Sequence, residues 1–124
     1  MKKLSLLLLS LCLTVTCWAQ PHETDVFQTK SGKTVKITCI KHASIMMEYD
    51  GKVIYFDPVI NMEPHTDFTT WPKADYIFVT HEHHDHFDSM ALTELRRSYT
   101  VIYTNHNVYT QWGSGYVLAN DEPQ

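Results

Sequence analysis

The chain is poor in the features that crosslink a fold or span a membrane. It has three cysteines in 124 residues, and two of them, Cys12 and Cys17, lie in an N-terminal segment that we expect to be removed. Cys39 is then left alone, which excludes a disulfide within the mature chain. Because Cys39 alternates with Val35 and Ile37, the pattern predicts a small buried residue in a strand rather than a reactive thiol.

The N-terminal segment has the three parts of a secretory signal peptide. A positive start precedes a leucine-rich run over residues 4–15, and small residues follow at Cys17 and Ala19. The run is shorter than the roughly 20 residues that a spanning helix needs. We therefore expect a signal peptide at residues 1–19, cleavage after Ala19 with Gln20 as the alternative, and a secreted, periplasmic protein. A lipoprotein attached through Cys17 is the alternative.

The remaining chain, residues 20–124, has the length of one small domain. The signal segment holds two of the ten basic residues and none of the fourteen acidic ones, so eight basic residues face fourteen acidic ones, a formal net charge of −6. A chain this acidic has no general field that attracts polyanions. We expect a small-molecule substrate, no nucleic acid, and no membrane contact after the signal is removed.

Apolar periodicity predicts a mixed fold with strands before helices. The predicted strands cover residues 33–40, 44–49, 52–56, 75–80, 100–104 and 116–119. Helices are predicted at residues 89–97, with Asp88 as N-cap, and at residues 107–112, ended by Gly113. The order, mostly strands and then β-loop-α-β-α-β, is typical of an α/β fold. Such folds place chemistry in loops that follow buried strands.

A dense group of metal-ligand residues follows one of these strands. Residues 81–86 read His-Glu-His-His-Asp-His. Imidazole and carboxylate ligands suit zinc, and also manganese or iron. The alternatives are a solvated histidine stretch or adventitious metal binding, but the position between a buried strand and a capped helix favours a built site. The spacing predicts that His81 and His83 chelate one ion, and that Asp85 and His86 face a second ion.

These residues carry a resemblance to a known family. Residues 80–86, Thr-His-Glu-His-His-Asp-His, match the His-x-His-x-Asp-His signature of the metallo-β-lactamase superfamily. The motifs around His42, Asp57 and residues 74–77 resemble its ascorbate-6-phosphate-lactonase-like branch of metal-dependent hydrolases, which usually has glycine where Lys41 stands. The resemblance covers roughly residues 33–119 and implies the N-terminal half of an αββα sandwich.

The resemblance assigns roles by position. It implies that His81 and His83 ligate the first of two Zn²⁺ ions, and that Asp85 and His86 ligate the second. Asp85 would also act in catalysis by orienting the nucleophilic water.

Two further residues are candidates for supporting the site. The resemblance implies that Asp57 braces the histidine loop from the outer shell around the ligands. The alternative is a turn residue before a proline. His42 would line the site, although a histidine at a strand end that bonds backbone is an equal alternative. Glu82 and His84 fall on variable positions and are interpreted as loop residues.

Some ligands that the family uses have no counterpart here. A third histidine, a bridging aspartate and a last histidine come from later parts of the family's domain, whereas His106 is the only histidine after His86. We expect His106 to be a surface residue at a helix start. The sequence is therefore expected to be a truncated form of a longer hydrolase. The alternatives are a half-domain completed by a partner chain or a homodimer, and the product of a broken gene.

The predicted function is hydrolysis by a metal-bound hydroxide on a small ester, lactone, amide or phosphodiester. The alternative is a non-catalytic zinc-binding half-domain that needs a partner chain. A third hypothesis is an antibiotic-hydrolysing β-lactamase, from which the resemblance to the lactonase-like branch points away.

Overall fold

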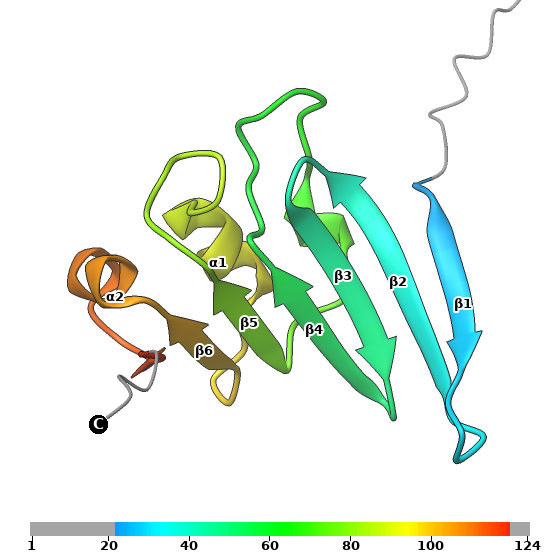
Figure 1. Ribbon diagram of the computed structural model, residues 1–124. Helices are drawn as coiled ribbons and strands as arrows, with labels where there is room; N and C mark the ends of the chain where they lie inside the picture. Colours follow the sequence, from blue (N-terminus) through cyan, green and yellow to red (C-terminus); the bar gives the residue numbers. More distant parts are fainter. Residues whose placement is uncertain (1–21, 120–124) are drawn as a thin grey trace, which may run out of the picture.

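The computed structural model describes residues 22–119, which form one seven-stranded sheet with its helices (Figure 1). The strands are β1 (Thr24–Gln28), β2 (Thr34–Lys41), β3 (Ser44–Tyr49), β4 (Lys52–Phe56), β5 (Tyr76–Val79), β6 (Val101–Thr104) and β7 (Tyr116–Val117). The helices are the 3-10 helix η1 (Phe68–Thr70), α1 (Ser89–Leu95) and α2 (His106–Trp112). The predicted signal peptide lies outside the described residues. Within them, no helix has the length and apolar character needed to cross a membrane.

The strands follow one another across the sheet in chain order. Neighbours from β1 to β4 are antiparallel, and neighbours from β4 to β7 are parallel. Hairpins join the antiparallel strands, whereas α1 and α2 lie in the connections between parallel ones, as parallel pairing requires. The predicted mixed α/β fold, with strands first and then β-loop-α-β-α-β, is confirmed.

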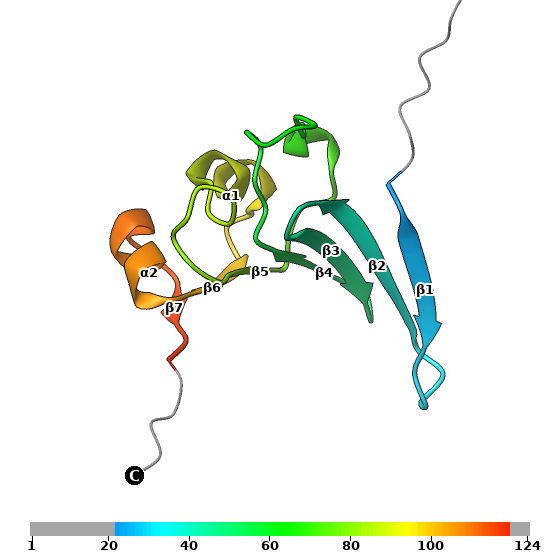
Figure 2. The ribbon, with the colours of Figure 1, turned by 45° about the horizontal axis from the view of Figure 1, so that its top comes forward.

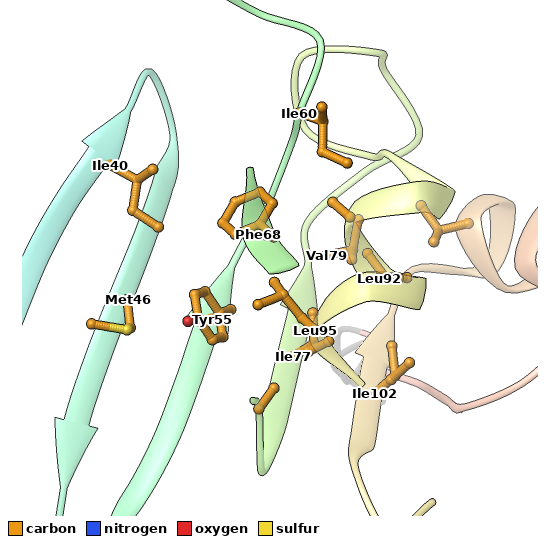
Figure 3. Packing of buried hydrophobic residues seen from close by; sticks show 13 residues of the cluster. Ile40, Met46, Tyr55, Ile60, Phe68, Ile77, Val79, Leu92, Leu95 and Ile102 are labelled. Carbon is orange, nitrogen blue, oxygen red and sulfur yellow. The ribbon is translucent and has the colours of Figure 1, made fainter. Parts of the chain in front are cut away.

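The helices cover one face of this sheet, and the hydrophobic core lies between the helices and that face (Figure 2). Tyr55, Ile77 and Ile102 stand in register on β4, β5 and β6 and are almost completely buried. Phe68 of η1 and Leu92 of α1 belong to the same apolar cluster (Figure 3). Burial of one such side chain contributes about 1.5–3 kcal/mol. This layer therefore holds the loops at the sheet edge in place.

The opposite face of the sheet carries a row of aromatic rings. Phe56, Phe78, Tyr103 and Tyr116 are paired in register across β4 to β7. Their ring centroids lie 5.2, 5.0 and 5.7 Å apart along the row. None of the helices in residues 22–119 covers this row (Figure 2).

The open face explains why the prediction for Cys39 is wrong. The sequence predicts a buried residue, but Cys39 is exposed. It pairs with Ile45, which pairs with Phe56, so it lies on the side of the aromatic row. The buried residues of β2 are instead Thr38 and Ile40, which alternate with it and face the helices.

Local capping signals place both helices. Asp88 caps α1, as predicted, by accepting backbone hydrogen bonds from Met90 and Ala91. The end of α1 is earlier than predicted, at Leu95, because the Leu95 carbonyl accepts a hydrogen bond from the Ala74 amide. Gly113, at φ 83°, ends α2 as predicted.

Three polar loops meet at one edge of the sheet. Because β4 and β5 are parallel, Asp57 and Thr80 emerge side by side at their carboxyl ends. Strand β2 points the same way, since it is separated from β4 by two antiparallel steps. The turn after β2 therefore brings His42 to the same edge.

Candidate metal centre

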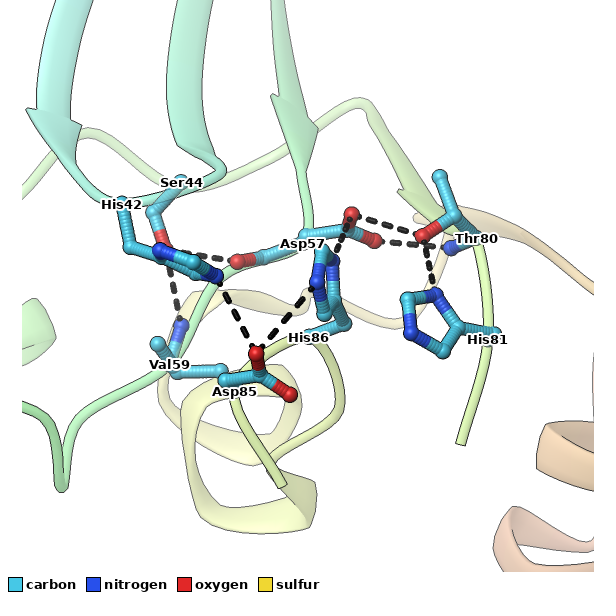
Figure 4. A network of polar contacts seen from close by, with 8 residues as sticks. All are labelled: His42, Ser44, Asp57, Val59, Thr80, His81, Asp85 and His86. Atoms are coloured by element: carbon cyan, nitrogen blue, oxygen red, sulfur yellow. Dashed lines mark hydrogen bonds and ion pairs between the residues drawn. The ribbon is translucent and has the colours of Figure 1, made fainter. Parts of the chain in front are cut away.

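Asp57 is the anchor of the site. It follows β4 and is 3% exposed, with φ at 43°. Its Oδ1 accepts a hydrogen bond from the Thr80 amide at 2.7 Å, and its Oδ2 accepts one from the Thr80 hydroxyl at 2.7 Å. Nδ1 of His86 lies 2.8 Å from the same Oδ2 (Figure 4). One buried carboxylate thus holds both ends of the histidine loop.

The turn that carries Asp57 is itself held by Ser44. The Ser44 hydroxyl donates to the Asp57 carbonyl at 2.6 Å and accepts from the Val59 amide at 3.3 Å. Both bonds are buried, so they satisfy backbone groups that water cannot reach. The β4 end is therefore fixed relative to the neighbouring strand β3.

The imidazoles of His81 and His86 are each oriented by a hydrogen bond that involves Nδ1. Since the Asp57 carboxylate can only accept, Nδ1 of His86 is the donor in that bond. The Thr80 hydroxyl hydrogen is used on Asp57, so this oxygen accepts from Nδ1 of His81 at 2.9 Å. In a neutral imidazole the other nitrogen, Nε2, then carries a lone pair. Both rings thus have Nε2 free to accept a hydrogen bond or to bind a cation.

The candidate ligands form two groups that share Asp85. One group contains His81, His83 and Asp85, and the other contains His42, Asp85 and His86. Within each group the ligand atoms all lie within 4.8 Å of one another. The rings of His81 and His86 connect the groups, with centroids 4.0 Å apart. Ligands bonded to zinc at about 2 Å lie roughly 3–4 Å from each other, so small side-chain movements would close either group.

In the group of His42, Asp85 and His86, atoms that could bind a cation face one another. Oδ2 of Asp85 lies 3.6 Å from Nε2 of His86 and 3.1 Å from Nε2 of His42 (Figure 4). Because Nε2 of His86 carries no proton in the neutral ring, two electron-pair donors point at one region. A divalent ion is the group that this chemistry accepts.

Asp85 stays ionised at neutral pH. Desolvation works to raise its pKa, but a backbone hydrogen bond and the neighbouring rings of His86 and His42 outweigh it. The pKa of the Asp85 carboxyl is therefore below its ordinary value. A carboxylate in this state can ligate a cation or accept a hydrogen bond from water.

A tight turn separates the two halves of the histidine loop. The amides of His86 and Phe87 both donate to the His83 carbonyl, at 2.9 and 2.8 Å. Asp88 then begins α1, and its Oδ2 accepts a hydrogen bond from the Ile60 amide at 3.0 Å. The turn reverses the chain so that ligands before and after it face the same space.

Lys41 is hydrogen-bonded to the loop that follows Asp57. Its ammonium donates to the carbonyls of Ile60, Met62 and Pro64 at 2.8, 2.8 and 2.9 Å. Desolvation lowers the pKa of Lys41, although Glu63 and Asp88 oppose this effect. A glycine at this position could not make these bonds, so the order of this loop depends on the Lys41 side chain.

Sequence reasoning missed the role of Glu82. This residue was interpreted as part of a variable loop, but its carboxylate accepts hydrogen bonds from Asn105 at 3.0 Å and Asn107 at 2.8 Å. The bond from Asn105, its own backbone and Asn107 lower the pKa of Glu82 to about 2. His84 belongs to neither ligand group. His106 is exposed at the first position of α2, as predicted.

Comparison with known proteins identifies the same segment. The family model described as "Beta-lactamase superfamily domain" matches residues 36–121. A UPF0173 metal-dependent hydrolase of Exiguobacterium sp. is 32% identical over 72 residues, which cover 57% of this chain and 32% of that protein. A UPF0173 metal-dependent hydrolase of Flavobacterium johnsoniae is 47% identical over 55 residues, which cover 42% of this chain and 24% of that protein.

Two solved structures share the fold. One is a protein of Parabacteroides distasonis described as a metal-dependent hydrolase, with a TM-score of 0.76 and 46% identity over 82% of this chain and 44% of that one. The other is Igni18, a metallo hydrolase of Ignicoccus hospitalis, with a TM-score of 0.55 and 26% identity over 73% of this chain and 41% of that one. The chain thus spans between a quarter and a third of the length of these two curated relatives and less than half of the solved structures. The lactonase-like branch stays a prediction.

Proposed function

Because the chain belongs to the β-lactamase superfamily, we propose that it binds divalent cations and takes part in hydrolysis. The observation that carries the proposal is the pair of ligand groups that share Asp85. Their imidazole and carboxylate donors fit zinc, and also manganese or iron. The named function of the relatives, metal-dependent hydrolysis, supports the same proposal.

His81, His83 and Asp85 would hold one ion, and His86, His42 and Asp85 would hold the other. When bound, such ions polarise water and the reacting bond of a substrate, which makes hydrolysis possible at neutral pH. His42 would join this set as a ligand by exchanging its hydrogen bond to Asp85 for the ion, whereas its sequence predicts only a site-lining position.

The protein's own residues prepare the site for this chemistry. Asp57 keeps the proton of His86 on Nδ1, and Thr80 does the same for His81, so both rings offer Nε2. Asp85 is an acceptor at neutral pH because its pKa lies below the ordinary value. Its carboxylate would orient the attacking water by accepting a hydrogen bond from it.

The substrate would be a small ester, lactone, amide or phosphodiester. All four classes react through attack of water at an electrophilic carbonyl or phosphorus, which this site would assist. Specificity in such a fold comes from the loops around the site rather than from the sheet. In this chain the nearest such loop is the one that Lys41 holds.

The proposal is tested by metal content and turnover together. Zinc per chain is measured in the purified protein, and hydrolysis is followed on a panel of ester, lactone, amide and phosphodiester substrates. Asp85→Ala should lose both bound zinc and turnover, whereas His84→Ala, on the same loop but outside both ligand groups, should keep both. Zinc binding without turnover on the panel would instead support a non-catalytic zinc-binding module. A wild-type chain that binds no divalent ion would overturn the proposal.

A further inference from the structure

Glu82 stands between His81 and His83 but is bonded to a different part of the fold. Its Oε2 accepts from Nδ2 of Asn105 at 3.0 Å, and its Oε1 accepts from Nδ2 of Asn107 at 2.8 Å. Both asparagines lie at the junction of β6 and α2. The histidine loop is therefore tied near its start to the neighbouring strand–helix connection, in addition to the Asp57 bonds to Thr80 and His86.

We propose that Glu82 is a positioning residue of the metal centre. By accepting both carboxamide hydrogen bonds, it fixes the backbone that carries His81 and His83 so that the two rings meet one ion. The inference rests on the proposed function, because it concerns the same ligands. Its physical basis is preorganisation: a loop that is already ordered loses less conformational freedom when the ion binds.

The asparagines are suited to this task in different ways. Oδ1 of Asn105 accepts the Val108 amide at 2.8 Å as the N-cap of α2, so the orientation of its carboxamide is fixed and Nδ2 must point at Glu82. Asn107 is exposed, and within residues 22–119 the side chain of Asn107 makes no other hydrogen bond. Asn107 can therefore rotate its amide without disturbing the fold.

Two simpler roles must be separated from positioning. Glu82 could act only by its negative charge near a cation, or only by stabilising the start of α2. Glu82→Gln separates charge from positioning. Its Oε1 can accept from Asn105, and its amide can donate to a rotated Asn107, so the variant loses the charge but keeps both hydrogen bonds.

Asn107→Asp separates positioning from helix stabilisation. A carboxylate in the first turn of α2 favours the helix dipole, which offsets part of the stability that loss of the Glu82 hydrogen bond removes. A purely structural role therefore predicts a shift in the unfolding temperature of the metal-free chain with wild-type zinc affinity. The same carboxylate repels Glu82 and breaks its hydrogen bond. Positioning therefore predicts weaker zinc binding in a chain that remains folded.

The experiment is a zinc titration of the full chain by calorimetry, with thermal unfolding of each metal-free variant. We expect Glu82→Ala to weaken zinc binding by about 10–100-fold, the usual effect of losing a partner behind the ligands. Glu82→Gln should stay close to wild type, Asn107→Asp should bind more weakly, and His84→Ala should be unchanged. Because Asn107 is exposed, its variant also serves if Glu82→Ala fails to fold.

Two results would overturn the inference while leaving the proposed function intact. One is wild-type zinc affinity in folded Glu82→Ala and Asn107→Asp. The other is equal weakening by Glu82→Gln and Glu82→Ala, which would assign the effect to charge alone. A wild-type chain that binds no zinc would contradict the proposed function itself, and the positioning role with it.

Discussion

Nδ1 of His86 donates to the carboxylate of Asp57 across 2.8 Å, and this carboxylate is almost completely buried. The pair joins the end of β4 to a residue 29 positions later in the chain. It sets which nitrogen of His86 is free, and it positions the ring beside Asp85.

Asp57→Asn should weaken both the fold and the site. Asparagine tolerates the φ of 43°, so the turn itself is retained. The amide cannot accept all three hydrogen bonds, and unfolding free energy should fall by about 1–3 kcal/mol. Zinc affinity should fall about 10–100-fold. Urea unfolding and zinc titration measure the two effects. Unchanged values in both would show that the Asp57–His86 contact does not order the site.

Thr80→Val should remove the hydrogen bond that orients His81 and one of the three that the Asp57 carboxylate accepts. Valine has a similar shape but no hydroxyl, so Nδ1 of His81 loses its acceptor. Zinc titration should show weaker binding, while the Thr80 amide still bonds Asp57. Thr80→Ser keeps the hydroxyl and should bind zinc like wild type. Equal binding by the valine and serine variants would rule out orientation of His81 by this hydroxyl.

Asp88→Ala should reduce stability while retaining the ligands. The side chain caps α1 and also accepts the Ile60 amide. Loss of a cap costs about 0.5–2 kcal/mol, and the unpaired Ile60 amide adds to this cost. Chemical unfolding followed by circular dichroism measures the change, with the adjacent exposed Ser89→Ala as the matched control. Loss of zinc binding in a folded Asp88→Ala chain would contradict this division of roles.

Removal of metal should lower the thermal stability of the chain. A ligand at 100 times its dissociation constant stabilises the native state by about 2.7 kcal/mol. A chelator should therefore lower the unfolding temperature of the wild-type protein. Zinc added back in excess should restore it. Asp85→Ala should unfold at the same temperature with and without zinc. A zinc-induced shift in that variant would place the bound ion elsewhere.

Local signals in the sequence predict much of this structure. Asp88 and Gly113 act within one helical turn of their own positions, so capping chemistry is enough to identify them. The candidate ligands within residues 81–86 are likewise contiguous in the sequence, whereas His42 joins them only through the fold. In contrast, β1 (Thr24–Gln28) was not predicted, because it is exposed throughout and has no apolar alternation.

Features that depend on distant contacts could not be predicted in the same way. The alternation in β2 defines two faces but does not say which face the helices cover, and so Cys39 was assigned to the wrong environment. Glu82 meets partners 23 and 25 residues away, and nothing near it in the sequence marks them. Asp57 was identified through a family resemblance, since an aspartate before a proline is also an ordinary turn.

The parallel pairing of β4 with β5 has a consequence for the time course of folding. This pairing brings Ile54 beside Tyr76 and must close a long connection before any ladder hydrogen bond forms. Contacts between distant segments are slow to form, whereas the β2–β3 and β3–β4 hairpins close locally. Since Asp57 reaches Thr80 and His86 only after this step, the candidate metal site should form late. In refolding experiments, a cobalt absorption band should therefore lag behind the first β-sheet signal.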